Sequence, residues 1–237
     1  MTPNAAERAR VRQLTERVLE HLDWAALGEI YFHWGGREFW QERRPQVLEL
    51  GDRLATALLS QLPRGGASLW VGAGVAELPA LLAEVLLGGR EVVAANLREQ
   101  ECAVLDAGLA AAAPDVALRF TPGDARTVAA GRTFDHLGCI SVFTDPETWP
   151  LLSDVVYGRI APVQIDVEQL VREREAARAL AAGLFARLRR PGLITTSAEE
   201  AAWFLEQAEG AGAQVDASED LVPTAVVGDP VGFLTVH

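Results

Sequence analysis

The 237-residue sequence contains no lysine, so all 21 of its basic side chains are arginines. This absence excludes Schiff-base chemistry on lysine, the phosphate-binding lysine of Walker motifs and lysine general bases. The 33 acidic residues outnumber the basic ones and give a net charge of −12. Non-specific binding to nucleic acid needs clustered basic side chains that contact the phosphates. We therefore expect a small-molecule or protein substrate and no nucleic-acid partner.

Cysteine is also scarce, because only Cys102 and Cys139 are present. Neither has another cysteine or a histidine at metal-ligand spacing, so we expect no disulfide framework and no metal site. The longest apolar stretch, residues 78–87, is interrupted by Pro79 and Glu84, and the N-terminus lacks the pattern of a signal peptide. These absences predict a cytoplasmic protein without a membrane partner, and they leave a homodimer as a candidate assembly.

Apolar residues make up 49% of the chain, which is enough for a sizeable core. Helical periodicity predicts an amphipathic helix over residues 4–22 and a second helix over 45–62, with Pro45 in its first turn. A Pro/Gly-rich segment follows the second helix and indicates a boundary. We expect an N-terminal helical cap over residues 1–63 and a sheet domain over 64–237.

Aromatic side chains gather between the two N-terminal helices, in residues 27–40. Such a cluster is most often core packing between a helical segment and the main domain. The functional alternative is a lid in which Tyr31, His33 or Trp34 faces a ligand.

Residues 68–78 predict a buried strand that breaks at Gly72 and Gly74 into a helix. A turn of this kind points backbone N–H groups and the positive end of a helix towards the edge of the sheet. Nucleotide-like ligands are commonly held there.

Strands and helices alternate from this point onwards, which is typical of an α/β fold with a doubly wound, mostly parallel sheet. The end of the chain predicts two strands about a tight turn, and hence a C-terminal antiparallel hairpin in a seven-stranded sheet. The expected strands cover residues 67–71, 91–95, 116–120, 134–142, 192–196, 221–227 and 231–236, and the expected helices cover 75–87, 98–113, 126–130, 167–190 and 198–209.

This order of motifs resembles the class I S-adenosylmethionine-dependent methyltransferases, a Rossmann-like family. The resemblance implies that Gly72, Ala73 and Gly74 bend around the methionine part of S-adenosylmethionine. It also implies that Asn96, followed by Leu97, occupies the place of the acid that binds the ribose. The tripeptide Gly123-Asp124-Ala125 matches a family motif whose aspartate binds the adenine amino group.

Three positions depart from the family pattern. The family has an acid where this chain has Trp70, a third glycine where it has Ala76 and an acid where it has Asn96. The two missing carboxylates remove charge-assisted hydrogen bonds worth about 1 kcal/mol each, so we expect weaker cofactor binding than is usual. Glu77 and Asp124 are the carboxylates able to compensate.

The acceptor site is expected after the fourth parallel strand, because ligands bind beyond the carboxyl ends of such strands. Asp145 and Glu147, together with His33, are the candidate catalytic bases. Each of them also fits a cap or a solvated loop residue. The candidate substrate-binding residues are aromatic: Tyr31, Trp34, Trp149 and Tyr157.

Several functions fit this pattern. The first is methyl transfer from S-adenosylmethionine to a small molecule or protein. The same fold also transfers the aminocarboxypropyl or aminopropyl substituent of the sulfonium. A non-catalytic scaffold or subunit that has kept the fold is a further interpretation, favoured by Trp70 and Asn96. A nicotinamide-dependent oxidoreductase ranks last, because the glycine motif ends in Glu77 and no lysine is present.

Overall fold

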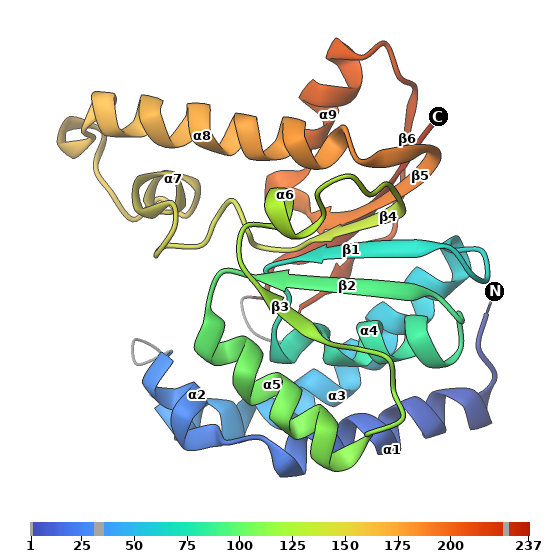
Figure 1. Ribbon diagram of the computed structural model, residues 1–237. Helices are drawn as coiled ribbons and strands as arrows, with labels where there is room; N and C mark the ends of the chain where they lie inside the picture. Colours follow the sequence, from blue (N-terminus) through green and yellow to red (C-terminus); the bar gives the residue numbers. More distant parts are fainter. Residues whose placement is uncertain (1, 31–35, 225–227) are drawn as a thin grey trace.

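The computed structural model describes residues 2–30, 36–224 and 228–237. One sheet forms the middle layer, and helices cover both of its faces (Figure 1). The eight strands found in these residues are β1 Ala67–Val71, β2 Glu91–Asn96, β3 Phe120–Pro122, β4 Phe134–Cys139, β5 Leu188–Ser197, β6 Val215–Ala217, β7 Val222–Pro223 and β8 Pro230–Val236.

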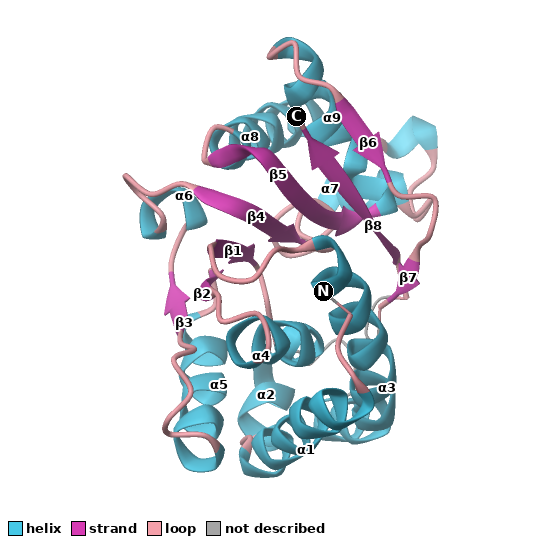
Figure 2. Cartoon of the chain, turned by 90° about the vertical axis from the view of Figure 1, so that its right-hand side faces the viewer, coloured by secondary structure: helices cyan, strands magenta, loops and turns pink. Residues whose placement is uncertain are grey.

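The strand order is β3-β2-β1-β4-β5-β8-β6, with β7 also paired to β8. Strands β1 to β5 are parallel, whereas β8 runs antiparallel to β5. Figure 2 shows β8 beside β5, with β6 and β7 beyond it. Since β6 and β7 pair with successive parts of β8, they form one interrupted edge strand, and the sheet has seven strand positions. The predicted mostly parallel sheet with a C-terminal antiparallel hairpin is confirmed.

The helices are α1 Ala5–His21, α2 Trp24–Ile30, α3 Gly36–Gln61, α4 Leu78–Leu86, α5 Glu99–Ala112, α6 Ala125–Val128, α7 Pro150–Val156, α8 Val167–Phe185 and α9 Ala201–Gly210, with short 3-10 segments at Val75–Glu77, Pro162–Gln164 and Ala198–Glu200. Helices α1 to α5 lie on one side of the sheet, and α6 to α9 lie on the other (Figure 1). None of the described helices is both long and apolar enough to span a bilayer.

The N-terminal helices share an apolar core with the sheet. Asn4 begins α1 with a reciprocal cap, since its side chain accepts the Glu7 N–H at 3.0 Å and the Glu7 carboxylate accepts the Asn4 N–H at 2.8 Å. Val18 and Leu19 of α1 are fully buried in the core that also contains α3, α4 and α5. The helices before the sheet are therefore one of its covering layers.

The second N-terminal helix is longer than the sequence predicts. It begins at Gly36, so Pro45 lies in its interior and not in its first turn. Proline inside a helix removes one backbone donor and crowds the preceding turn, which is why the sequence favours a helix start there. The packing of α3 against α2 and α4 stabilises the helix despite the proline.

Several strand boundaries also differ from the prediction. β4 ends at Cys139 instead of residue 142, and β7 covers only Val222–Pro223 of the described part of the strand expected over 221–227. β3 starts at Phe120 instead of 116, because the guanidinium of Arg119 donates to the carbonyls of Val116 and Leu118 and replaces strand pairing there. β5 already starts at Leu188, so the helix expected to reach residue 190 ends at Phe185. The pairing of β5 with β4 overrides the local helical pattern.

Candidate active site

A cavity of about 740 Å³ opens at the carboxyl ends of the parallel strands. It lies where the strand order reverses between β1 and β4, the place where open α/β sheets bind ligands. The turns after β1, β2 and β4 line it, and Ala176, Ala179 and Leu180 of α8 add an apolar wall. This volume is within the range of small-molecule pockets.

The turn after β1 forms one wall of the cavity. Gly72 has a φ of 68°, a left-handed conformation that favours glycine, and its N–H donates to the Ala95 carbonyl at 2.7 Å. A Cβ on Gly74 would lie 2.6 Å from Oε1 of Glu101, so a larger residue there would displace the Glu101 carboxylate. Gly72 and Gly74 line the cavity, whereas Ala73 is buried behind it with 1% exposure.

At the end of β2, Asn96 and Leu97 line the cavity, but the Asn96 side chain is engaged with the protein itself. Its Nδ2 donates to the Ala73 carbonyl and to Oε2 of Glu101, both at 3.0 Å. Its Oδ1 accepts the Arg98 N–H at 2.9 Å. An amide held in this way positions Glu101 beside the cavity.

Two carboxylates therefore stand beside the glycine turn. Glu101, which the sequence reasoning missed as an ordinary first-turn acid of α5, is fully buried and lines the cavity. Oε2 of Glu77 accepts the Gly74 N–H at 2.8 Å. Burial, with a further contribution from the nearby charge of Glu101, raises the pKa of Glu77 to about 7, although the hydrogen bond from Gly74 lowers it in part. A cationic ligand group at this place would relieve that repulsion.

Asp124 and Ala125 also line the cavity, at the start of α6. Asp124 caps this helix by accepting the Arg126 N–H at 2.8 Å. The Arg126 guanidinium bonds the same carboxylate, with Nη2 at 2.5 Å from Oδ2, and these hydrogen bonds lower the pKa of Asp124. Asp124 is therefore an ionised carboxylate with a cation beside it.

The predicted bases Asp145 and Glu147 form ion pairs across the cavity. Nη2 of Arg98 lies 3.2 Å from Asp145 Oδ1 and 2.9 Å from Glu147 Oε2. Oδ2 of Asp145 also accepts the Thr148 hydroxyl at 2.7 Å. Asp145 and Glu147 therefore lie at the cavity wall and share the guanidinium of Arg98.

The predicted aromatic residues are separated by the fold. Trp149 lines the cavity at 8% exposure, and its indole Nε1 has no hydrogen-bond partner among the described residues. Tyr157 does not line the cavity and donates instead to Asp229 at 2.6 Å. The expected lid residues Tyr31, His33 and Trp34 lie outside the described part of the chain.

Glu200 is a further candidate site residue. The sequence does not identify it, because it is one of two neighbouring acids at the start of a helix. It is fully buried, and its Oε1 accepts the N–H of Phe143 at 2.7 Å and that of Thr144 at 3.0 Å. Burial raises the pKa of Glu200 to about 8, although these hydrogen bonds lower it in part. Glu200 fixes the loop that follows β4 against the cavity.

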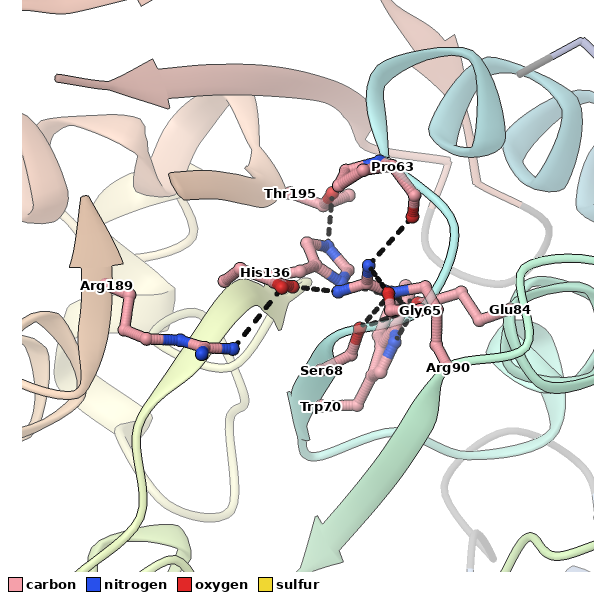
Figure 3. A network of polar contacts seen from close by, with 10 residues as sticks. Pro63, Gly65, Ser68, Trp70, Glu84, Arg90, His136, Arg189 and Thr195 are labelled. Carbon is pink, nitrogen blue, oxygen red and sulfur yellow. Dashed lines mark hydrogen bonds and ion pairs between the residues drawn. The ribbon is translucent and has the colours of Figure 1, made fainter. Parts of the chain in front are cut away.

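Trp70, the first departure from the family pattern, is part of the hydrophobic core. It is 1% exposed, and its Nε1 donates to Oε1 of Glu84 at 2.7 Å. Ser68, Arg90 and His136 surround the same carboxylate (Figure 3). Burial alone would raise the pKa of Glu84. The charge of His136 and the hydrogen bonds from His136, Ser68 and Trp70 outweigh burial, so the pKa is lowered overall.

The indole ring of Trp70 also needs space in the sheet. It lies over Gly138 of the neighbouring strand β4, where a Cβ would be 2.3 Å from a ring atom. Trp70 therefore replaces a family carboxylate by a core contact and provides no ligand group in the cavity.

No protein-family model matches the sequence, and no curated protein sequence matches it. Solved structures do resemble the fold. Precorrin-6y C5,15-methyltransferase from Geobacter metallireducens superposes with a TM-score of 0.51 at 14% identity over 78% of this chain and 88% of that one. TrmN from Thermus thermophilus gives 0.51 at 20% identity over 78% of this chain and 48% of that one. The 16S rRNA methylase RmtB superposes with a TM-score of 0.50 at 15% identity, over 100% of this chain and 77% of that one.

These likenesses show the class I methyltransferase fold for this chain. The present chain spans about half the length of TrmN. At identities this low, the likeness shows the fold and not the ligand or the reaction.

Proposed function

We propose that the protein is an S-adenosylmethionine-dependent methyltransferase that acts on a small-molecule or protein acceptor. The observation that carries this proposal is the cavity at the strand-order switch, bounded by a glycine turn and containing carboxylates beside it. The same fold in solved methyltransferases supports the proposal.

The residues present fit S-adenosylmethionine, which carries two cationic groups in its methionine part. Glu77 and Glu101 place two carboxylates next to the glycine turn, where the charge repulsion between them favours a bound cation. They compensate for the acid missing at Trp70. The orphaned indole N–H of Trp149 offers a donor for an acceptor atom of the ligand.

Other residues of the cavity have roles that follow from their contacts. Asn96 holds Glu101 in place, and the ion pair of Asp124 with Arg126 keeps a carboxylate ionised at the wall. The apolar wall from α8 excludes water from one side. Bound S-adenosylmethionine supplies an electrophilic methyl group, and alignment of the acceptor with that group accounts for most of the rate gain.

The net charge of the protein bears on the class of acceptor. RmtB is named for its 16S rRNA substrate, but the net charge of −12 disfavours RNA for this chain. The cavity contains the guanidinium groups of Arg98 and Arg126, and both of these are paired with carboxylates. A small-molecule or protein acceptor fits best.

Two labelled forms of S-adenosylmethionine test the reaction. The purified protein is incubated with a cell extract and cofactor labelled either in the methyl group or in the carboxyl carbon of the methionine part. Methyl transfer labels a small molecule or protein only from the methyl-labelled form. Label transferred only from the carboxyl carbon would indicate aminocarboxypropyl transfer, and transfer from neither form would support the scaffold interpretation. Both of these results contradict the proposal.

A further inference from the structure

Ser141 has an unusual backbone two residues after β4. Its φ of 53° makes it the one non-glycine residue with a positive φ in the described chain. Such a conformation is unfavourable for a residue with a side chain and persists where neighbouring groups hold it. Ser197, which is fully buried, accepts the Ser141 N–H on its Oγ at 2.7 Å. The strained backbone is thus fixed by a specific hydrogen bond.

The Ser141 hydroxyl meets a buried carboxylate. Its Oγ donates to Oδ2 of Asp229 at 3.1 Å, and Asp229 is 7% exposed. Because β8 is antiparallel to β5, Asp229 just before it reaches the carboxyl ends of the parallel strands. No arginine or histidine of the described residues forms an ion pair with Asp229. Among the described residues, the side chains that donate to Asp229 are the hydroxyls of Ser141 and Tyr157.

Tyr157 supplies the second of these donors. Its hydroxyl lies 2.6 Å from the same Asp229 oxygen. Burial raises the pKa of Tyr157, and the hydrogen bond to Asp229 raises it further, so the phenol keeps its proton. Asp229 accepts a hydrogen bond from each of the two hydroxyls, and Ser197 Oγ lies 3.3 Å from Ser141 Oγ. Even where the Ser197 hydroxyl donates to it, the Ser141 oxygen keeps one lone pair for a donor from the cavity.

Ser141 lies close to the glycine turn. It lines the cavity together with Val142, and a Cβ on Gly72 would be 3.0 Å from Cγ2 of Val142. The loop that carries Ser141 therefore covers the turn beside which the methionine part of the cofactor is proposed to bind. Ser141 therefore lies at the cavity wall beside this turn.

We propose that Ser141 and Asp229 form a proton-accepting pair for an acceptor that carries an N–H or O–H group. This inference rests on the proposed function. The acceptor proton passes to Ser141 Oγ while the Ser141 proton passes to Asp229 Oδ2. The bonding pair of the acceptor N–H or O–H stays on its nitrogen or oxygen. Ser141 ends as a neutral hydroxyl, and Asp229 ends as a carboxylic acid that returns its proton to water. Ser141 is the catalytic residue, and Asp229 positions it.

Sinefungin and S-adenosylhomocysteine are the probes. Sinefungin carries an ammonium group where the transferable methyl would be, whereas S-adenosylhomocysteine has nothing there. Calorimetry measures both dissociation constants for the wild type, Ser141→Gly, Asp229→Asn and the control Thr148→Val. Glycine adopts the positive φ without strain, so Ser141→Gly removes the hydroxyl while keeping the loop. Thr148→Val removes a cavity hydroxyl outside the pair.

We expect Ser141→Gly and Asp229→Asn to weaken sinefungin about tenfold or more, because a charge-assisted hydrogen bond is lost, with S-adenosylhomocysteine changed less than about threefold. The control should leave the ratio of the two constants unchanged. An equal loss of both ligands, or no loss of either, would overturn the pair while leaving the proposed function intact. Wild-type protein that binds neither probe would overturn both.

Discussion

Replacing Glu200 by glutamine removes the charge of this buried side chain and keeps its shape. In the folded protein burial raises the pKa of Glu200 to about 8 from its ordinary value of 4.5. The unfolded chain loses this proton near pH 4.5, whereas the folded chain keeps it to about pH 8. Between these values the folded state holds the extra proton, so the free energy of unfolding falls as pH rises.

The size of this effect follows from the pKa shift. One pKa unit corresponds to about 1.4 kcal/mol, so Glu200 should cost on the order of 4 to 5 kcal/mol of stability above about pH 8. A glutamine at this position would stay neutral, and its oxygen could still accept the Phe143 and Thr144 N–H groups. Its amide nitrogen would replace Oε2, which has no partner among the described residues, at a cost of about 1 to 3 kcal/mol.

Urea unfolding of both proteins from about pH 5 to about pH 9 measures the difference. Glu200→Gln should be less stable than the wild type at the acidic end of this range and more stable at the alkaline end. Glu77 titrates in the same direction, but it is present in both proteins and cancels from the comparison. A stability difference that stays constant over this range would refute the raised pKa of Glu200 and its burial beside the loop.

Three further substitutions test the site and the core. Asn96→Asp should lower the free energy of unfolding by about 1 to 3 kcal/mol, because it sets a second carboxylate 3.0 Å from Glu101; unchanged urea unfolding would contradict this contact. Gly138→Ala should cost about 1 to 3 kcal/mol, since its Cβ would collide with Trp70, and a thermal midpoint equal to that of the wild type would disprove the overlap. Glu101→Gln should weaken S-adenosylmethionine about tenfold in calorimetry, whereas the exposed control Glu99→Gln should not; equal affinities for all three proteins would remove Glu101 from the site.

The sequence predicted the fold well because apolar periodicity and glycine turns are local signals. The alternation of strands and helices after residue 66, the glycine turn at Gly72 and the antiparallel end all appear in the structure. The start of α3 was missed because tertiary packing overrides the preference of Pro45. The edge strand β6 was missed because three residues carry too little pattern.

The candidate site was predicted less completely, since its chemistry depends on which side chains the fold brings together. Motif positions such as Gly74 and Asp124 do line the cavity. Glu101 and Asp229 could not be identified from spacing, because one is an ordinary helix acid and the other comes from a turn far along the chain from β4. Asp145 was selected for its place after β4, but its ion pair with Arg98 is a contact that no local pattern shows.

Calorimetric titration of the wild-type protein with S-adenosylhomocysteine, with NAD as the comparison ligand, tests the central proposal most directly. The cavity and its carboxylates predict binding of S-adenosylhomocysteine at micromolar concentrations and no binding of NAD. Absence of S-adenosylhomocysteine binding at millimolar concentrations, or tighter binding of NAD, would contradict the assignment of this cavity to S-adenosylmethionine.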